Sequence, residues 1–268
     1  MIAEILHLRR KKETLKKIAI TIFCMMALVA TCCSTACANQ STKVEKDTEA
    51  VESKNNEGYM TNNNVCTQDE YEQTLFGQSI STERNGEMRL GIKCTHDSYA
   101  ELTIYKAQDG KYISVFSCPA MIGKNGPAKH AEGDTKTPLG TWTIGEAYGI
   151  KENPGSLLPY TQVTEDMYWC ATGNHGTKYN QLIYKSDEPD ADYSEDEHLV
   201  DYQIQYAYFI DLGYNKGCAP YAGNAIFLHC WKEENGAPIP TGGCVSVSEE
   251  SMIEILKLLP AGTVVTIY

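Results

Sequence analysis

The feature that most constrains the fold of this chain is a short alternating segment near the C-terminus, residues 225–230, with the sequence AIFLHC. Side chains of a β-strand point alternately to its two faces. Alternation divides the segment into two sets: Ala225, Phe227 and His229 on one face, and Ile226, Leu228 and Cys230 on the other. We therefore expect a strand that presents a histidine on one face and a cysteine on the opposite face.

A glycine turn with a second cysteine follows this strand, in the sequence PTGGCVSV at residues 240–247. Two glycines before Cys244 let the backbone approach a substrate and turn N–H groups inward, as an oxyanion hole requires. A thiol attacks as the thiolate, and a cysteine with an ordinary pKa of about 8.5 needs a neighbouring base. We assign Cys244 as candidate nucleophile, His229 as base, and the N–H groups of Gly243 and Cys244 as oxyanion hole. Taken alone, the spacing also fits a structural Cys/His pair and a plain tight turn.

Several further segments make this chain similar to a known family, the L,D-transpeptidase catalytic domain (YkuD) family. Residues 241–245 fall on the family signature Ser/Thr-x-Gly-Cys-Ile/Val, and His229 falls on its strand histidine. Residues 133–145, GDTKTPLGTWTIG, resemble its G-D-x-K-T-P-x-G strand, and residues 179–180 and 223–227 match further pieces. The resemblance runs from about residue 97 to the end of the chain.

This resemblance implies a fold that is mainly β, an L,D-transpeptidase-like β-sandwich with one C-terminal helix and long connecting loops. It implies cysteine acyl transfer on peptidoglycan stem peptides, in cell-wall organisation and cell shape, with no cofactor and no metal. Motif positions and aromatic residues of the long loop supply the candidate substrate-binding set: Thr241, Gly242, Ser246, Trp169, Tyr179, Asn180 and Asn224.

Two positions depart from the family pattern. Many members have a histidine where this chain has Gly242, and many have an arginine where it has Ser246. The first change removes a possible hydrogen-bond donor, and the second removes a cation that could orient the loop or a substrate carboxylate. Neither affects the nucleophile or the base, but both bear on how substrate is held.

The N-terminus indicates export. Basic residues at 9–17 precede an apolar run at 18–30, and Ala36-Cys37-Ala38 fits a small-x-small cleavage site. Three forms remain open for residues 1–38: a cleaved signal peptide, a lipoprotein linked through Cys37, and an uncleaved anchor, since residues 18–38 are just long enough to span a bilayer. All three place the rest of the chain on the outer side of the membrane, in the cell wall, with possible membrane anchorage.

Charge and cysteine content narrow the function further. The formal net charge is −12, and removal of the basic leader makes the remainder more acidic, which disfavours nucleic-acid binding. Seven cysteines follow residue 38. An odd number in an oxidising compartment suggests one unpaired thiol, for which Cys244 is the candidate, with three disulfides possible among the others. Because none of the seven forms a C-x-x-C pair, a structural zinc site is not expected.

The remaining chain divides into a polar tether and one domain. Residues 39–85 are rich in Lys, Glu, Asn, Thr and Ser and are expected to be disordered, whereas residues 86–268 form the catalytic domain. Within it we expect a hairpin around Asp109-Gly110, and a long strand at residues 202–212. Residues 150–198 form a long connection of the kind that builds lids or cleft walls, and their acidic run at 187–197 is expected to be a solvated rim.

A helix is expected after the cysteine loop. Its apolar stripe consists of Met252, Ile255, Leu256 and Leu259. Ser246 or Ser248 begins it, and Pro260 ends it. We expect the positive end of this helix to lower the pKa of Cys244.

Three functions remain open from the sequence. The first is a peptidoglycan L,D-transpeptidase, in which Cys244 takes the acyl group of a tetrapeptide stem, D-Ala leaves, and an amine of a second stem gives a 3-3 cross-link. The second is an L,D-carboxypeptidase that hydrolyses the same thioester. The third is a non-catalytic cell-wall-binding module with the same fold.

Overall fold

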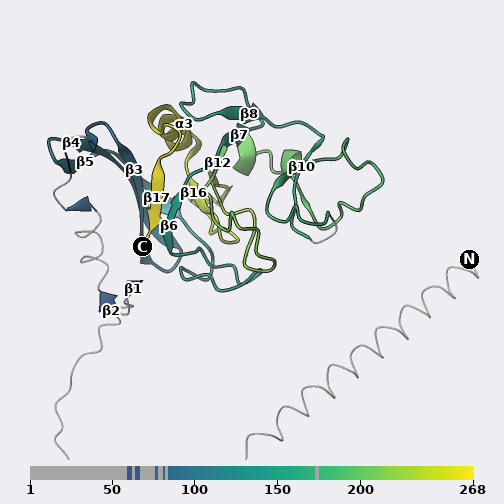
Figure 1. Cartoon of the computed structure of the whole chain (residues 1–268), viewed down its shortest axis with the longest axis horizontal. Coiled ribbons are helices and arrows are strands. Elements are labelled where there is room, and N and C mark those ends of the chain that lie inside the picture. Colours follow the sequence, from purple (N-terminus) through teal and green to yellow (C-terminus); the bar gives the residue numbers. More distant parts are fainter. Residues whose placement is uncertain (1–58, 62–63, 67–75, 78–80, 82–83, 173–174) are drawn as a thin grey trace, which may run out of the picture. The chain divides into compact units, whose positions relative to one another are not determined.

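One ten-stranded sheet organises the part of the chain that the structure describes (Figure 1). The structure is a computed structural model and describes residues 59–61, 64–66, 76–77, 81, 84–172 and 175–268. The expected leader, residues 1–38, and most of the expected tether lie outside these residues. Among the described residues, no helix has the length and apolar character needed to cross a membrane.

The main sheet brings distant parts of the chain together. Its strands pair in this order: β6 (Gly140–Thr143), β17 (Val264–Ile267), β3 (Met88–His96), β4 (Tyr99–Gln108), β5 (Lys111–Met121), β16 (Val245–Val247), β13 (Phe227–Cys230), β12 (Phe209–Asp211), β7 (Ala147–Gly149) and β8 (Tyr160–Gln162). The β17–β3, β13–β16 and β7–β8 pairs are parallel, and the other pairs are antiparallel.

Smaller elements are not part of this sheet. They are the three strands β10 (Leu182–Tyr184), β9 (Met167–Trp169) and β11 (Glu197–His198), the pair β14 (Glu233–Glu234) and β15 (Ala237–Pro238), the pair β1 (Tyr59–Thr61) and β2 (Asn64–Cys66), the 3₁₀ turns η2 (Leu199–Asp201) and η3 (Gln205–Ala207), and the helix α3 (Glu249–Leu258). Figure 1 shows the β9–β10 lobe beside the β7–β12 end of the sheet. A mainly β fold with a single C-terminal α-helix among the described residues confirms the expected fold class.

Local sequence explains the β4–β5 hairpin and the helix. The hairpin turns at Asp109 and Gly110, which both have positive φ, 50° and 76°, as a two-residue turn between twisted strands requires. Helix α3 begins at Glu249, and its N-cap Ser248 accepts a hydrogen bond from the backbone N–H of Ser251 at 3.1 Å. Both predictions are confirmed.

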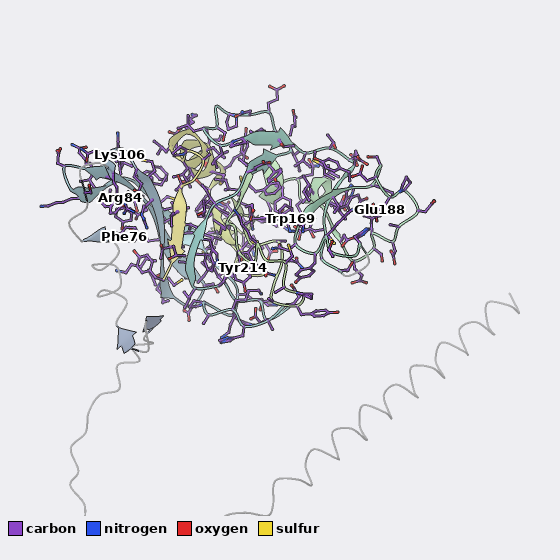
Figure 2. The ribbon with its side chains drawn as sticks, in the orientation of Figure 1. Phe76, Arg84, Lys106, Trp169, Glu188 and Tyr214 are labelled. Atoms are coloured by element: carbon purple, nitrogen blue, oxygen red, sulfur yellow. The ribbon has the colours of Figure 1, made fainter. Side chains whose placement is uncertain are left out.

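The two faces of β13 belong to two hydrophobic cores. Ile226, Leu228 and Cys230 lie in the larger core, together with the apolar stripe of α3, Met252, Ile255, Leu256 and Leu259. Ala225 and Phe227 lie in a second core with Trp169 and Leu199 from the long connection. Figure 2 shows Trp169 inside this region and Glu188 at the outer edge of the lobe. The alternation read from residues 225–230 is therefore confirmed.

The long strand expected at residues 202–212 is wrong for its first half. Only Phe209–Asp211 is strand, and η3 precedes it. The backbone N–H of Tyr206 bonds to the carbonyl of Tyr202 at 2.8 Å, so a turn hydrogen bond replaces the sheet hydrogen bond. Ile204, which lies inside the expected strand, is 55% exposed.

Packing also reaches into the segment assigned to the tether. Phe76 is buried, and its ring stacks on Tyr105 with a centroid distance of 4.2 Å. Figure 2 shows Phe76 beside the β3–β5 region. The boundary at residue 85 stays a prediction.

The three disulfides that the cysteine count allowed are not formed, because Cys118, Cys170, Cys218 and Cys230 are free thiols.

Candidate active site

The parallel pairing of β13 with β16 brings the histidine strand and the cysteine loop together. Leu228 pairs with Val245 and His229 pairs with Ser246, so the residue before β16, Cys244, arrives beside Phe227. The backbone N–H of Phe227 donates to Cys244 Sγ at 3.4 Å. Residues two apart on a strand share a face, so Cys244 and His229 lie on the same face of the sheet.

Hydrogen bonds fix the loop that carries Cys244. Thr241 Oγ1 donates to the carbonyl of Cys244 at 2.6 Å and accepts from the N–H of Gly243 at 3.1 Å. Thr137 Oγ1 donates to the carbonyl of Gly243 at 2.8 Å. Gly243 has a φ of 146°, and a Cβ there would stand 2.9 Å from the carbonyl of Lys136. Only glycine fits this position without strain.

The thiol of Cys244 is free and is held by the backbone. It donates to the carbonyl of Ala225 at 3.0 Å while accepting from Phe227. Burial raises the pKa of Cys244 to about 12, against the Phe227 N–H, which lowers it. The lowering of this pKa that we expected from α3 is not found: burial dominates, and all of β16 separates Cys244 from the N-cap of the helix. The resting thiol is therefore protonated at neutral pH.

His229 is buried and neutral at the resting site. Its Nδ1 lies 2.8 Å from the carbonyl of Cys230. Because a carbonyl can only accept, Nδ1 carries the proton and Nε2 keeps a lone pair. Burial lowers the pKa of His229 from 6.5 to about 4, although the Cys230 carbonyl favours the charged form. The imidazole is therefore ready to accept a proton at neutral pH.

A pocket of about 330 Å³ contains this pair. Most of the residues proposed from the sequence line it: His229, Cys244, Gly243, Gly242, Thr241, Ser246 and Asn224. Trp169, Tyr179 and Asn180 are not among its lining residues. The sequence candidates therefore form two groups. One group lines the pocket, and the other, Trp169, Tyr179 and Asn180, lies behind its wall.

The group behind the wall holds the pocket together. Asn180 accepts from Trp169 Nε1 and from the backbone N–H of Ala225, both at 3.0 Å, which ties the β9–β10 lobe to the start of β13. The hydroxyl of Tyr179 donates to Glu132, a pocket residue, at 2.7 Å. These contacts position the wall from outside.

Sequence reasoning missed a cation beside the glycine loop. The side chain of Lys129 is 2% exposed, lines the pocket, and pairs with Asp134 at 2.8 Å. Its Nζ lies 3.7 Å from where a Cβ of Gly243 would stand. Asp134 belongs to the G-D-x-K-T-P segment already quoted, and that motif was the available signal. The arginine of the family pattern is absent at position 246, but Lys129 places a cation beside the same loop.

It also missed two inward-facing residues of the acidic run. The side chain of Asp196 is 0% exposed and bonds to His175 Nε2 at 2.7 Å, while Glu197 lines the pocket and accepts a hydrogen bond from Tyr206. The solvated rim expected at 187–197 is wrong for these two. Nothing in the local sequence distinguishes these two residues from the exposed acidic residues of the same run.

The fold and the site together define a class of protein: mainly β domains in which a cysteine and a histidine face one pocket. The L,D-transpeptidase catalytic domain family, YkuD, matches residues 98–267, and the chain belongs to this family.

Three solved structures that the chain is similar to share little sequence with it. Bd1075 of Bdellovibrio bacteriovorus is 17% identical over 72% of this chain and 51% of its own, with a TM-score of 0.36. The L,D-transpeptidase of Stackebrandtia nassauensis is 17% identical over 70% and 60%, with a TM-score of 0.30. The helical cell shape determining protein Pgp2 of Campylobacter jejuni is 16% identical over 75% and 55%, with a TM-score of 0.34.

The chain therefore spans about half to three fifths of the length of these structures. No curated protein matches it.

Proposed function

We propose that the protein is a peptidoglycan L,D-transpeptidase of the cell envelope, exported and acting on the outer side of the membrane through Cys244. The observation that carries this proposal is the meeting of Cys244 and His229 in one pocket on one face of the sheet. The fixed tautomer of His229, with Nε2 free to accept, supports its role as base. Membership of the family supports the class of reaction.

Acylation begins from a neutral pair. Because burial disfavours both a lone thiolate and a lone imidazolium, the thiol proton moves to His229 Nε2 as sulfur attacks the carbonyl of the third stem residue. The N–H groups of Gly243 and Cys244 receive the oxyanion, for which Gly243 exchanges its bond to Thr241 Oγ1. His229 then returns the proton to the amine of D-Ala, which leaves, and a thioester remains on Cys244.

The experiment uses the purified full chain and tetrapeptide muropeptides, followed by mass spectrometry. Wild type should release D-Ala, accumulate a thioester on Cys244 and form dimers. Cys244→Ala should release none, whereas Cys218→Ala, which removes a thiol outside the pocket, should retain the wild-type rate.

The products separate the alternatives. Trimmed monomers without dimers would establish the carboxypeptidase, and binding without any product would establish the wall-binding module. Full D-Ala release by Cys244→Ala would remove the nucleophile assignment.

A further inference from the structure

Two carboxyl groups in the pocket wall have no cationic partner among the described residues. Glu197 accepts a hydrogen bond from Tyr206, and Glu132 accepts from Tyr179 at 2.7 Å and from Asn224 at 3.2 Å. All these partners are neutral donors. Lys129, the buried cation of the same pocket, pairs with Asp134 instead.

Glu197 is an energetically costly residue at this position. Burial raises the pKa of Glu197 to about 7, the Tyr206 hydrogen bond opposes this, and Glu132 adds to the rise. A carboxylate removed from water without a cation is unfavourable, and groups of this kind are frequent at functional sites. A ligand that brought a positive charge would compensate for the burial.

Ser246 provides a second, independent observation. It is 1% exposed, it lines the pocket, and its Oγ has no hydrogen-bond partner among the described residues. A buried hydroxyl without a partner is uncommon in native proteins and calls for an explanation such as a missing ligand. Because Ser246 follows Cys244 by two residues on the same strand face, its hydroxyl is available to a group that approaches the thioester.

His229 connects these groups. Ser246 is its partner in the parallel register of β13 and β16. On another side, the ring of Tyr206 meets the imidazole edge to face with a centroid distance of 5.9 Å, and the hydroxyl of Tyr206 bonds to Glu197. An ammonium group has three N–H donors and no acceptor. A carboxylate, a hydroxyl oxygen and the lone pair of Nε2 are three acceptors that line the same pocket.

We propose that Glu197 and Ser246, together with His229 of the same pocket, form the acceptor subsite, which binds the ammonium group of the second stem peptide. This inference rests on the proposed function and names the residues that choose an amine over water. Glu132 adds negative charge to the same wall. A carboxylate binds a charged ammonium group more strongly than it binds neutral water, so the subsite favours cross-linking over hydrolysis of the thioester.

Aminolysis of the thioester begins with a proton transfer. The bound ammonium gives one proton to Nε2 of His229, and the resulting amine attacks the thioester carbon. A C–N bond forms, the C–S bond breaks, and the sulfur leaves with the electron pair. The proton on His229 returns to sulfur and restores the thiol, while the second proton lost from nitrogen passes to solvent.

The test measures how the thioester divides among acceptors. The purified full chain is incubated with tetrapeptide donor and an amine-bearing stem as acceptor, and separately with hydroxylamine, a small nucleophile that is uncharged at neutral pH. Dimers and hydroxamate are each expressed per D-Ala released. Glu197→Gln should lower the dimer ratio about tenfold, the effect of losing one charged hydrogen bond, and leave the hydroxamate ratio unchanged.

Two further variants complete the test. Glu165→Gln removes the same charge from a carboxylate that is 90% exposed and outside the pocket, and both ratios should stay at the wild-type value. Ser246→Ala removes only the unpartnered hydroxyl and should lower the dimer ratio about threefold, the effect of a weak neutral hydrogen bond. Should Glu197→Gln fail to fold, Ser246→Ala decides alone.

Unchanged dimer ratios in a folded Glu197→Gln protein, or an equal fall with both nucleophiles, would overturn the acceptor subsite. Failure of the proposed function looks different: wild type itself would release no D-Ala and form no thioester.

Discussion

Cys230 lies on β13 and Cys244 directly precedes β16, the parallel neighbour of β13, yet the two cysteines face opposite sides of the sheet. Cys230 is 1% exposed in the larger core, among Ile226 and Leu228, and Cys244 opens into the pocket. Burial raises the pKa of each thiol to about 12. The pKa of the resting thiol therefore does not distinguish the candidate nucleophile from the structural cysteine. What differs is the surroundings: Cys244 shares its face with a buried imidazole, whereas Cys230 Sγ donates to the carbonyl of Tyr208 at 3.6 Å among core side chains.

The largest expected effect tests that imidazole. His229→Ala removes the group that takes the thiol proton, and general base catalysis contributes about 100-fold to 10,000-fold. We expect D-Ala release to fall by that amount, whereas Cys230→Ala, the neighbour on the other face, should stay within about twofold. Rates of both variants near wild type would remove the distinction between the faces.

Thiol alkylation tests the claim that the resting Cys244 is protonated. With a pKa of about 12 instead of 9.0, its thiolate fraction at neutral pH is about a thousandfold lower than in the unfolded chain. Labelling by iodoacetamide, followed by peptide mass spectrometry, should be correspondingly slow in the folded protein and rise with pH. Rapid labelling at pH 7 would instead indicate a preformed thiolate–imidazolium pair.

The acid side of the pH profile tests the buried imidazole more finely. Only neutral His229 accepts the thiol proton, and its lowered pKa of about 4 keeps it neutral at pH 5. The kcat/KM for D-Ala release at pH 5 should stay within about twofold of its value at pH 7. An imidazole with the ordinary pKa of 6.5 would reduce it about thirtyfold, and a fall of that size would show that His229 is solvated.

The smallest expected effect is on stability, to which Cys230 should contribute more than Cys244. Cys230→Ala removes a packed thiol from the larger core and should lower the free energy of unfolding by about 1 kcal/mol. Cys244→Ala should lower the free energy of unfolding by less, because the Cys244 side chain borders the pocket and its replacement removes a buried polar group. Urea denaturation of both variants gives the comparison, and a larger loss for Cys244→Ala would contradict it.

Local sequence signals predicted the strand at Phe227–Cys230, the Asp109-Gly110 turn and the helix with its Ser248 cap. Each depends on neighbours within a few residues, so the sequence carries it directly. The fold class and the pocket position of Cys244 and His229 followed from motifs whose order and spacing match the family.

Features that depend on distant partners were not predictable. The alternation at residues 202–212 fits a strand, but Tyr206 and Tyr208 divide between the two cores and a turn results. Asp196 and Glu197 resemble surface residues until His175 and Tyr206 approach them. The thiol pKa follows from burial, which no single segment encodes.

Thr137 illustrates a different kind of dependence. Its hydroxyl accepts from the N–H of Gly123 at 2.9 Å and donates to the carbonyl of Gly243, more than a hundred residues away in the chain. A nascent chain that has not yet brought these regions together lacks the shaped loop. Catalytic activity should therefore appear late in folding and in a single step. A partly folded chain should have an unreactive Cys244.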